Sequence, residues 1–313
     1  MKTDDSYRDK IAAESKKWGD HLTVEASGQW NAWLDHPLIG EHYRKRALVE
    51  GLPWERWVSK ALGGPAEKSL DLGCGSGGRS LSAFKQGASR YVEGLDVSED
   101  RVAKGERRRR ESGIPGEFRV ADSNTATLTA ENYDLIFSSH SFHHFLELEH
   151  IMQQVHQALT PRGLFILEEF VGPTQFQWTD QQIDLVRSLM SLIPERLRRL
   201  RWDAVKFMEG RPTVEDVVAA SPFESIRSSE IFPLFQQHFE VVELRRLGGT
   251  IQHLLYNGIV HNFLPDDDEA VRYLRAILEV EDALVDSGML SSDFMVLIGR
   301  RKDSTFGTQD GNS

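Results

Sequence analysis

The sequence contains a single cysteine, Cys74, and no long run of hydrophobic residues. One cysteine cannot form a disulfide within the chain, and cysteine-poor chains are typical of reducing compartments. No apolar segment approaches the roughly 20 residues that a membrane-spanning helix needs. The first residues, Met1–Ser6, are polar, whereas a secretory signal peptide requires an apolar stretch. These absences predict a cytoplasmic protein with no membrane partner.

Positive charge is also scarce. The 313 residues carry a formal net charge of −11, and wide contact with nucleic acid needs a basic surface, so we expect no nucleic-acid partner. With 40% hydrophobic and 27% charged residues, the composition is that of an ordinary globular protein. The length allows one large domain, or one domain and a smaller unit. The oligomeric state is left open, with a homodimer as one option.

Glycines are concentrated in the stretch SLDLGCGSGGR, Ser69–Arg79, at positions 73, 75, 77 and 78. The pattern predicts a buried strand, a tight turn and the N-terminus of a helix. Glycine is required where φ is positive or where a ligand approaches the backbone closely. The N–H groups at a helix N-terminus attract negative charge and ligand oxygens. A nucleotide-like ligand is therefore predicted on this turn.

Strands and helices alternate after residue 63. Five strands are predicted, over residues 68–72, 91–95, 117–121, 133–138 and 164–167. Such alternation at short spacing indicates a parallel, doubly wound α/β sheet. Two more strands, 239–244 and 293–299, follow a change of pattern. We therefore predict a mostly parallel, seven-stranded sheet.

Helical segments precede and interrupt this sheet. Residues 1–62 are predicted as an N-terminal helical extension, either packed against the domain or forming a lid over the ligand. Residues 173–225 are predicted as a helical cap insert, and insertions at the carboxyl ends of strands line the ligand crevice of such sheets. The sheet domain then comprises residues 63–172 and 226–301, and residues 302–313 are expected to be a disordered tail. The insert has aromatic candidates for substrate contact: Phe176, Trp178, Trp202 and Phe207.

The glycine turn alone is compatible with two ligands. The spacing Gly73-x-Gly75-x-x-Gly78, with Asp96 at the end of the next strand, also satisfies the dinucleotide fingerprint. Asp71, just before the first glycine, would repel a pyrophosphate but would hold an ammonium group. Asp122, after the third strand, suits the exocyclic amine of an adenine. These acids favour a ligand with both an ammonium group and an adenine.

Together the motifs resemble those of class I S-adenosylmethionine-dependent methyltransferases of the small-molecule type. The stretch DLGCGSGG (residues 71–78) is similar to the first motif of that family, and SSHSFHH (residues 138–144) resembles its segment after the fourth strand. The resemblance implies a Rossmann-like fold, S-adenosylmethionine as the methyl donor and a small-molecule acceptor.

The resemblance also implies roles for individual residues. The backbone of the glycine turn would contact the methionine part of the cofactor, and Asp71 would fix its ammonium group. Asp96 would bind the ribose hydroxyls, and Asp122 the adenine amine. The residues expected around the cofactor are Asp71, Gly73, Cys74, Gly75, Gly77, Asp96, Val97, Asp122, Ser123 and Ser138.

Methyl transfer from a sulfonium is an in-line displacement, so a base is required only if the acceptor must lose a proton. His140, directly after the fourth strand, is the favoured candidate for that base, and His143 is another. Glu168 and Glu169 end the fifth strand, and Glu169 is included among the catalytic candidates. Both acids are expected to face the same crevice, one of them orienting a substrate hydroxyl or a histidine and the other facing solvent or capping a turn.

A second histidine group lies late in the chain. His253, Asn257 and His261 recur every four residues, which predicts that they share one helix face. This stripe is either an ordinary helix face or a set of groups pointing into the site. His253 is the fourth catalytic candidate.

No catalytic metal is expected, because metal-dependent relatives use acids after the fourth strand, where this chain has Ser138, Ser139 and His140. The favoured function is O-methylation of a hydroxylated natural product or sugar-like compound in biosynthesis, with C- or N-methylation as alternatives. An NAD-binding oxidoreductase and a non-catalytic S-adenosylmethionine-binding protein are the alternatives outside this class.

Overall fold

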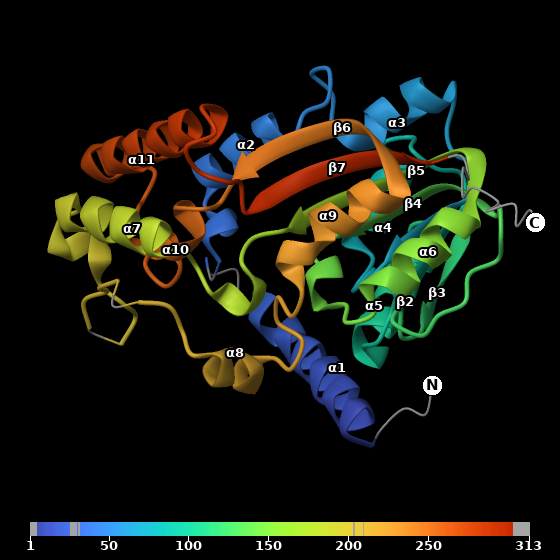
Figure 1. Ribbon diagram of the computed structural model, residues 1–313, viewed down its shortest axis with the longest axis horizontal. Coiled ribbons are helices and arrows are strands. Elements are labelled where there is room, and N and C mark those ends of the chain that lie inside the picture. The colour runs from blue at the N-terminus through green and yellow to red at the C-terminus, as the bar shows by residue number, and fades with distance from the viewer. Residues whose placement is uncertain (1–4, 26–29, 31, 203, 209, 303–313) are drawn as a thin grey trace, which may run out of the picture.

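The computed structural model describes residues 5–25, 30, 32–202, 204–208 and 210–302. Apart from residue 302, the tail expected to be disordered lies outside this part of the chain. Helices precede the sheet: α1 (Asp5–Glu25), the 3-10 turn η1 (Trp33–Asp35), α2 (Pro37–Arg46) and α3 (Trp54–Leu62). In Figure 1, α1 runs diagonally below the sheet, whereas α2 and α3 lie towards the top of the view. No helix in the described ranges combines the length and the hydropathy that crossing a membrane requires.

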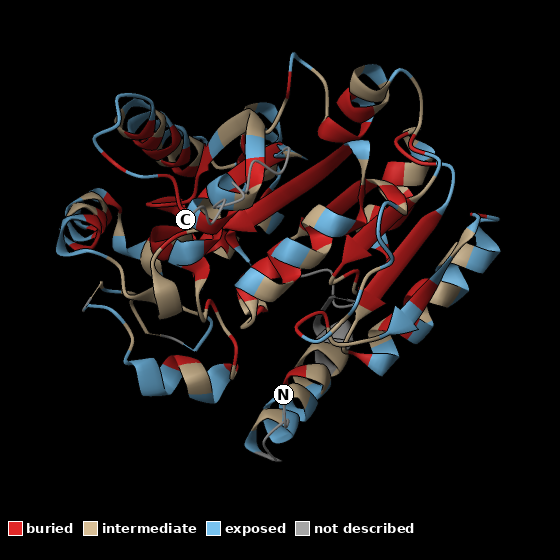
Figure 2. Ribbon diagram, turned by 45° about the vertical axis from the view of Figure 1, so that its right-hand side comes forward, coloured by how far each residue is buried: buried red, intermediate tan, exposed pale blue. Residues whose placement is uncertain are grey.

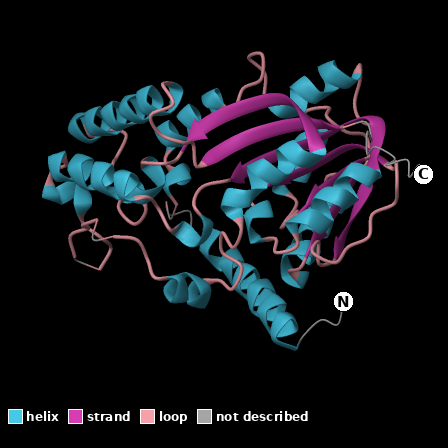
Figure 3. Ribbon diagram, viewed as in Figure 1, coloured by secondary structure: helices cyan, strands magenta, loops and turns pink. Residues whose placement is uncertain are grey.

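Seven strands form one sheet in the order β3-β2-β1-β4-β5-β7-β6 (Figure 3). They are β1 (Ser69–Leu72), β2 (Val92–Asp96), β3 (Gly116–Val120), β4 (Tyr133–Ser139), β5 (Leu159–Phe170), β6 (Phe239–Gly248) and β7 (Phe294–Arg301). Strands β1 to β5 pair in parallel, and β7 is antiparallel to both β5 and β6. The order runs outward from β1 in both directions, which opens a ligand crevice at the carboxyl ends of β1 and β4. The predicted mostly parallel, seven-stranded sheet is confirmed.

Helices cover both faces of the sheet. They are α4 (Gly78–Lys85), α5 (Glu99–Glu111), α6 (Leu148–Ala158), α7 (Asp180–Leu192), α8 (Val214–Ala220), α9 (Ser228–His238), α10 (Gln252–Tyr256) and α11 (Asp268–Asp286), with 3-10 turns η2 (Phe142–His144), η3 (Thr174–Phe176), η4 (Glu195–Arg198) and η5 (Val260–Asn262). Successive strand residues point to opposite faces. Thus Phe137 of β4 belongs to the apolar cluster of α3, whereas Ile136 belongs to that of α6 and α9. Figure 2 shows the resulting burial of the central strands.

The fifth strand is longer than predicted. It extends from Leu159 to Phe170 instead of covering residues 164–167. Its pairing with β4 begins at Leu159 opposite Tyr133 and resumes at Leu164 opposite Leu135, so the residues between bulge out of the ladder. The Pro161–Gly163 segment, which has the sequence of a turn, is this bulge within the strand. Glu168 and Glu169 therefore lie inside the strand and not beyond its end.

The prediction of a histidine stripe late in the chain is wrong. His253, Asn257 and His261 do not lie on one helix. Helix α10 ends at Tyr256, and Asn257 has the extended ψ of 129°. The ammonium of Lys206 accounts for this end, since it donates to the carbonyls of Leu254 (2.6 Å), Leu255 (3.2 Å) and Asn257 (2.6 Å). A cation on the last carbonyls is a common way to finish a helix.

Candidate functional site

The glycine turn between β1 and α4 is closely packed. Gly73 and Gly77 both have φ near +74°, where glycine is favoured. A Cβ on Gly73 would lie 2.3 Å from the Cβ of Ser141, and a Cβ on Gly77 would lie 2.4 Å from the Phe118 ring. The turn therefore needs glycine both for its backbone and for its contact with η2 and β3.

Asp96, at the carboxyl end of β2, holds the turn in place. Its Oδ2 accepts a hydrogen bond from the N–H of Gly75 and its Oδ1 accepts one from the N–H of Ser98, both at 2.8 Å. Burial raises the pKa of Asp96, and these two N–H groups act against that rise. Each carboxylate oxygen has two acceptor sites. One on each oxygen thus remains for a ligand hydroxyl.

Asp122 follows β3 and makes contacts that the sequence did not suggest. Its Oδ2 accepts a hydrogen bond from the hydroxyl of Tyr7 at 2.6 Å. Its Oδ1 accepts from the backbone and side-chain N–H groups of Asn124, both at 2.9 Å. Tyr7 belongs to α1, so the N-terminal helix reaches the acid expected to bind adenine.

A cavity lies between α1, the glycine turn, η2 and the ends of β2 and β3. Its lining comprises Ile11, Glu14, Trp18, Gly73, Asp96, Val97, Arg101, Ala121, Asp122, Ser123, Asn124, His140, Ser141, His144, Phe145 and Phe223. Helix α1 thus forms one wall of this cavity. Asn124 and Ser141 were missed by the sequence analysis, although each is within two residues of a predicted one.

Five predicted cofactor residues line this cavity: Gly73, Asp96, Val97, Asp122 and Ser123. The other five, Asp71, Cys74, Gly75, Gly77 and Ser138, are not among the lining residues and belong to the turn and strand ends behind it. Asp71 is 1% exposed and accepts a hydrogen bond from the hydroxyl of Ser80, on α4. Burial raises the pKa of Asp71 to about 7, which Ser80 and Arg79 partly oppose. In this structure Asp71 therefore braces α4 against β1.

His140 lies at the cavity, as predicted, directly after β4. It has a positive φ of 52°, and its N–H donates to the carbonyl of Glu168 at 2.9 Å. Its Nε2 is 3.7 Å from Oε1 of Glu168, too long for a hydrogen bond but close enough for the carboxylate to attract a protonated imidazole. Burial raises the pKa of Glu168, but Arg79 and His140 outweigh it and bring the pKa to about 2. Glu168 is thus a buried, ionised carboxylate beside the histidine.

Glu169 points to the opposite face of the sheet. Its Oε2 is 2.6 Å from Nδ1 of His143, and its Oε1 accepts the N–H groups of Ser141 and Phe142. Burial acts to lower the pKa of His143, but Glu169 outweighs this and raises it. Neither Glu169 nor His143 lines the cavity. Neither acid faces solvent, because Glu168 is 5% exposed and Glu169 is fully buried. Glu169 instead caps the start of η2, which is the other option given for the second acid.

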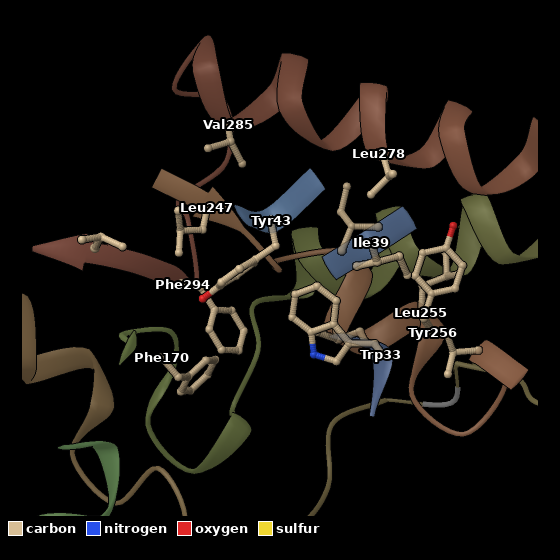
Figure 4. Close-up of a cluster of buried hydrophobic side chains, with 14 of the residues drawn as sticks. Trp33, Ile39, Tyr43, Phe170, Leu247, Leu255, Tyr256, Leu278, Val285 and Phe294 are labelled. Carbon is tan, nitrogen blue, oxygen red and sulfur yellow. The ribbon is translucent and has the colours of Figure 1, made fainter. Parts of the chain in front are cut away.

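His253 lies in an aromatic cluster beyond His140. Its ring centroid is 5.8 Å from that of Phe294 and 5.9 Å from that of Phe170. The Tyr43 ring is 6.3 Å from His140 and 6.1 Å from Phe294. Figure 4 shows Tyr43, Phe294 and Phe170 side by side with Trp33 next to them. Aromatic side chains therefore connect His140 to His253.

The insert contributes only part of the aromatic surface expected from it. Phe176 and Trp178 stack with centroids 5.3 Å apart and contact His253. Trp202 and Phe207 are 72% and 65% exposed. The first two aromatics thus extend the cluster, whereas the other two face solvent.

Replacing His253 with leucine is expected to reduce the loss of stability in acid. Burial holds the pKa of His253 at about 4, below the 6.5 of the free side chain. The unfolded chain therefore binds the extra proton as the pH falls from 6.5 to about 4, which lowers the unfolding free energy of the native protein. At about 1.4 kcal/mol per pH unit, the loss of unfolding free energy that His253 causes approaches about 3 kcal/mol.

Urea unfolding at pH 7 and at pH 4.5 measures this loss of unfolding free energy. The His253→Leu variant should lose about 2–3 kcal/mol less between the two pH values than the native chain. The half-buried His156, changed to leucine, is the matched control and should behave like the native chain. If His253→Leu and the native chain lost the same unfolding free energy between the two pH values, the low pKa of His253 in the folded protein would be contradicted.

The family comparison agrees with this geometry. Residues 64–209 match the family model described as a methyltransferase domain. The matched segment contains the glycine turn, Asp96, Asp122 and His140. Residues 64–209 are therefore similar to a methyltransferase domain.

Curated relatives match a smaller part of the chain. Squalene methyltransferase 1 of Botryococcus braunii is 29% identical over 116 residues, which is 36% of this chain and 30% of that protein. The arginine-hydroxylase NDUFAF5 of Homo sapiens is 29% identical, covering 35% and 30%. The ubiquinone biosynthesis O-methyltransferase of Pseudomonas syringae pv. syringae is 27% identical, covering 34% and 46%. Each match thus spans less than half of the relative's length.

Among solved structures, the chain aligns with geranyl diphosphate C-methyltransferase from Streptomyces coelicolor A3(2), bound to Mg²⁺, geranyl diphosphate and S-adenosyl-L-homocysteine. The identity is 14%, the TM-score is 0.49, and the alignment covers 80% of this chain and 77% of that one.

Proposed function

We propose that this protein is an S-adenosylmethionine-dependent methyltransferase that methylates a hydroxyl group of a small molecule. The observation that carries the proposal is the shared cavity, in which Asp96, Asp122 and His140 line the same space. The family match of the domain supports S-adenosylmethionine over the dinucleotide.

The cavity residues suit the parts of this cofactor. Asp96 has acceptor sites left on both oxygens for the two ribose hydroxyls, and Asp122 can accept from an adenine amine in addition to its present donors. The apolar side chains of Val97, Ala121 and Phe145 line the cavity and suit an adenine ring. When bound, S-adenosylmethionine supplies an electrophilic methyl group on a sulfonium.

His140 is proposed to accept the proton of the acceptor hydroxyl. An imidazole is suited to this near neutral pH. The ionised Glu168, 3.7 Å away and buried, stabilises the imidazolium that then forms. The low pKa of Glu168 keeps it from taking the proton itself. Of the other candidates, His253 is a poor base because burial holds its pKa at about 4.

The acceptor is proposed to be largely apolar or aromatic apart from the hydroxyl. Tyr43, Phe294 and Phe170 extend from His140 towards the insert, and aromatic rings favour flat or apolar molecules. Residues 1–62 and 173–225 are proposed to enclose it, since α1 lines the cavity and Phe176 and Trp178 join the aromatic cluster. The O-methyltransferase among the relatives supports an oxygen acceptor.

Transfer of a labelled methyl group from S-adenosylmethionine tests the proposal. A panel of phenols and hydroxylated apolar compounds should include methylated products, together with amines and alkenes as N- and C-acceptors. His140→Gln should lower kcat about 10²- to 10⁴-fold with little change in cofactor affinity, and His156→Gln should leave it unchanged. Methylation only of carbon or nitrogen, or full activity of His140→Gln, would remove the proposed base.

A further inference from the structure

Two neighbouring histidines and a glutamate gather beside the cofactor cavity. They are His143 and His144 of η2 and Glu224, in the segment between α8 and α9. One potential metal ligand atom from each lies within 4.8 Å of the other two. Nε2 of His143 is 3.8 Å from Oε1 of Glu224, which is too long for a hydrogen bond. The cluster is thus close together but not joined by direct hydrogen bonds between these groups.

Each histidine has its Nδ1 against a buried carboxylate. Nδ1 of His143 is 2.6 Å from Oε2 of Glu169, and Nδ1 of His144 is 3.0 Å from Oε1 of Glu14. The first contact is a hydrogen bond that fixes the His143 ring, and the His144 ring packs between Trp18 and His143. Both ring nitrogens of His144 are buried and have no hydrogen-bond partner among the described residues, so Nδ1 lies at ion-pair distance from Glu14 and Nε2 is unpaired. A carboxylate on one ring nitrogen is the usual arrangement of a metal-binding histidine, whose other nitrogen binds the ion.

The charges in the cluster also favour a cation. Glu14, Glu169 and Glu224 bring three carboxylates, of which the first two are at most 3% exposed. The ammonium of Lys17 lies 3.4 Å from Glu224 and forms an ion pair with it. Buried carboxylates are costly unless they are paired or bind a metal. A divalent ion between the rings and Glu224 would balance this charge.

We propose that His143, His144 and Glu224 bind a divalent transition-metal ion, with Zn²⁺ as the best-fitting ion. Two imidazoles and one carboxylate form a ligand set that Zn²⁺ uses, at about 2.0–2.2 Å, with a fourth position left for water or a ligand. Glu169 and Glu14 orient the two histidines. Because His144 and Glu14 line the cavity, the ion lies at its wall.

The ion would connect three separate segments: η2, the loop of Glu224 and, through Glu14, helix α1. It would therefore hold α1 over the cavity. Its ligands, two imidazoles and one carboxylate, differ from the acids that the sequence analysis expected of a catalytic metal site after the fourth strand. The proposal does not depend on methyl transfer, since metal binding is measured without S-adenosylmethionine.

Calorimetric titration of the chelator-treated, tag-free full chain with Zn²⁺ tests the site. We expect one ion per chain and a rise in melting temperature. Glu224→Gln and His144→Phe should weaken Zn²⁺ binding by about 100-fold or more, and Glu14→Gln by about 10- to 100-fold. His156→Ala changes a half-buried histidine away from the cluster; it is the matched control and should bind like the native chain. Co²⁺ bound in place of Zn²⁺ should give the visible absorption of a four-coordinate site.

Melting temperatures of the metal-free variants separate loss of the site from loss of the fold. Glu224→Gln is nearly isosteric and should melt close to the native chain without metal. If the native chain shows no binding, or if Glu224→Gln and His144→Phe bind Zn²⁺ as tightly as His156→Ala does, the proposal is overturned. The cluster would then be a set of ion pairs that fastens α1.

Discussion

Asp96→Ala is expected to weaken the binding of S-adenosylhomocysteine at least about 100-fold. Each hydrogen bond proposed from a ribose hydroxyl to the carboxylate would be charge-assisted, and such bonds contribute about 1.5–3 kcal/mol. Two of them correspond to a loss of two or more powers of ten in affinity. The same substitution releases the N–H groups of Gly75 and Ser98, which loosens the glycine turn.

Calorimetry with S-adenosylhomocysteine measures this effect. Glu99→Ala, an exposed acid three residues further on, is the matched control and should bind like the native chain. Asp96→Asn keeps one acceptor oxygen and the shape of the side chain. Its affinity for S-adenosylhomocysteine should therefore lie between that of the native chain and that of Asp96→Ala. An affinity of Asp96→Ala within threefold of the native chain would mean that the ribose binds elsewhere.

Arg79→Met is expected to lower the free energy of unfolding by about 3–5 kcal/mol, because it removes one partner of a buried charge cluster. The guanidinium donates to Glu55 at 3.1 Å, to Ser139 at 3.2 Å and also to Glu168. Both glutamates are at most 5% exposed. Without the arginine, two buried carboxylates lose their counter-charge.

Urea unfolding of Arg79→Met and of Arg90→Met provides the measurement. Arg90 forms an ion pair with Glu67 in which both side chains are at least 60% exposed, and such pairs contribute about 0–1 kcal/mol. A loss below 1 kcal/mol in Arg79→Met would show that Glu55 and Glu168 find other partners or become protonated. Arg79→Lys keeps the charge but cannot reach both acids, so we expect partial recovery.

The sequence predicted the sheet because its signals are local. Apolar runs of strand length, each followed by a turn and an amphipathic segment, indicate parallel strands with crossover helices. The acids Asp96 and Asp122 were found for the same reason, since each directly follows a strand. Because β2 and β3 pair in parallel, their carboxyl ends lie at the same edge of the sheet, and both acids line the same cavity.

The sequence could not predict which face of the sheet Glu168 and Glu169 each point to, or which partners they contact there. Adjacent residues of a strand point to opposite faces, but the sequence does not say which face belongs to which partner. Here Glu168 points towards Arg79 and His140, and Glu169 towards His143. Both are buried, which the composition of the segment gives no reason to expect for two adjacent acids.

The position of α1 over the cavity was also beyond local signals. Tyr7, Glu14 and Trp18 contact residues more than a hundred positions away, such as Asp122 and His144. Contacts of that range depend on the complete fold. The break in α10 has the same origin, since Lys206 reaches it from the distant insert.

Titration of the native chain with S-adenosylhomocysteine and, separately, with NAD tests the central claim most directly. The account predicts one site per chain for S-adenosylhomocysteine and no heat of binding with NAD. Binding of NAD in place of S-adenosylhomocysteine, or of neither compound, would contradict it.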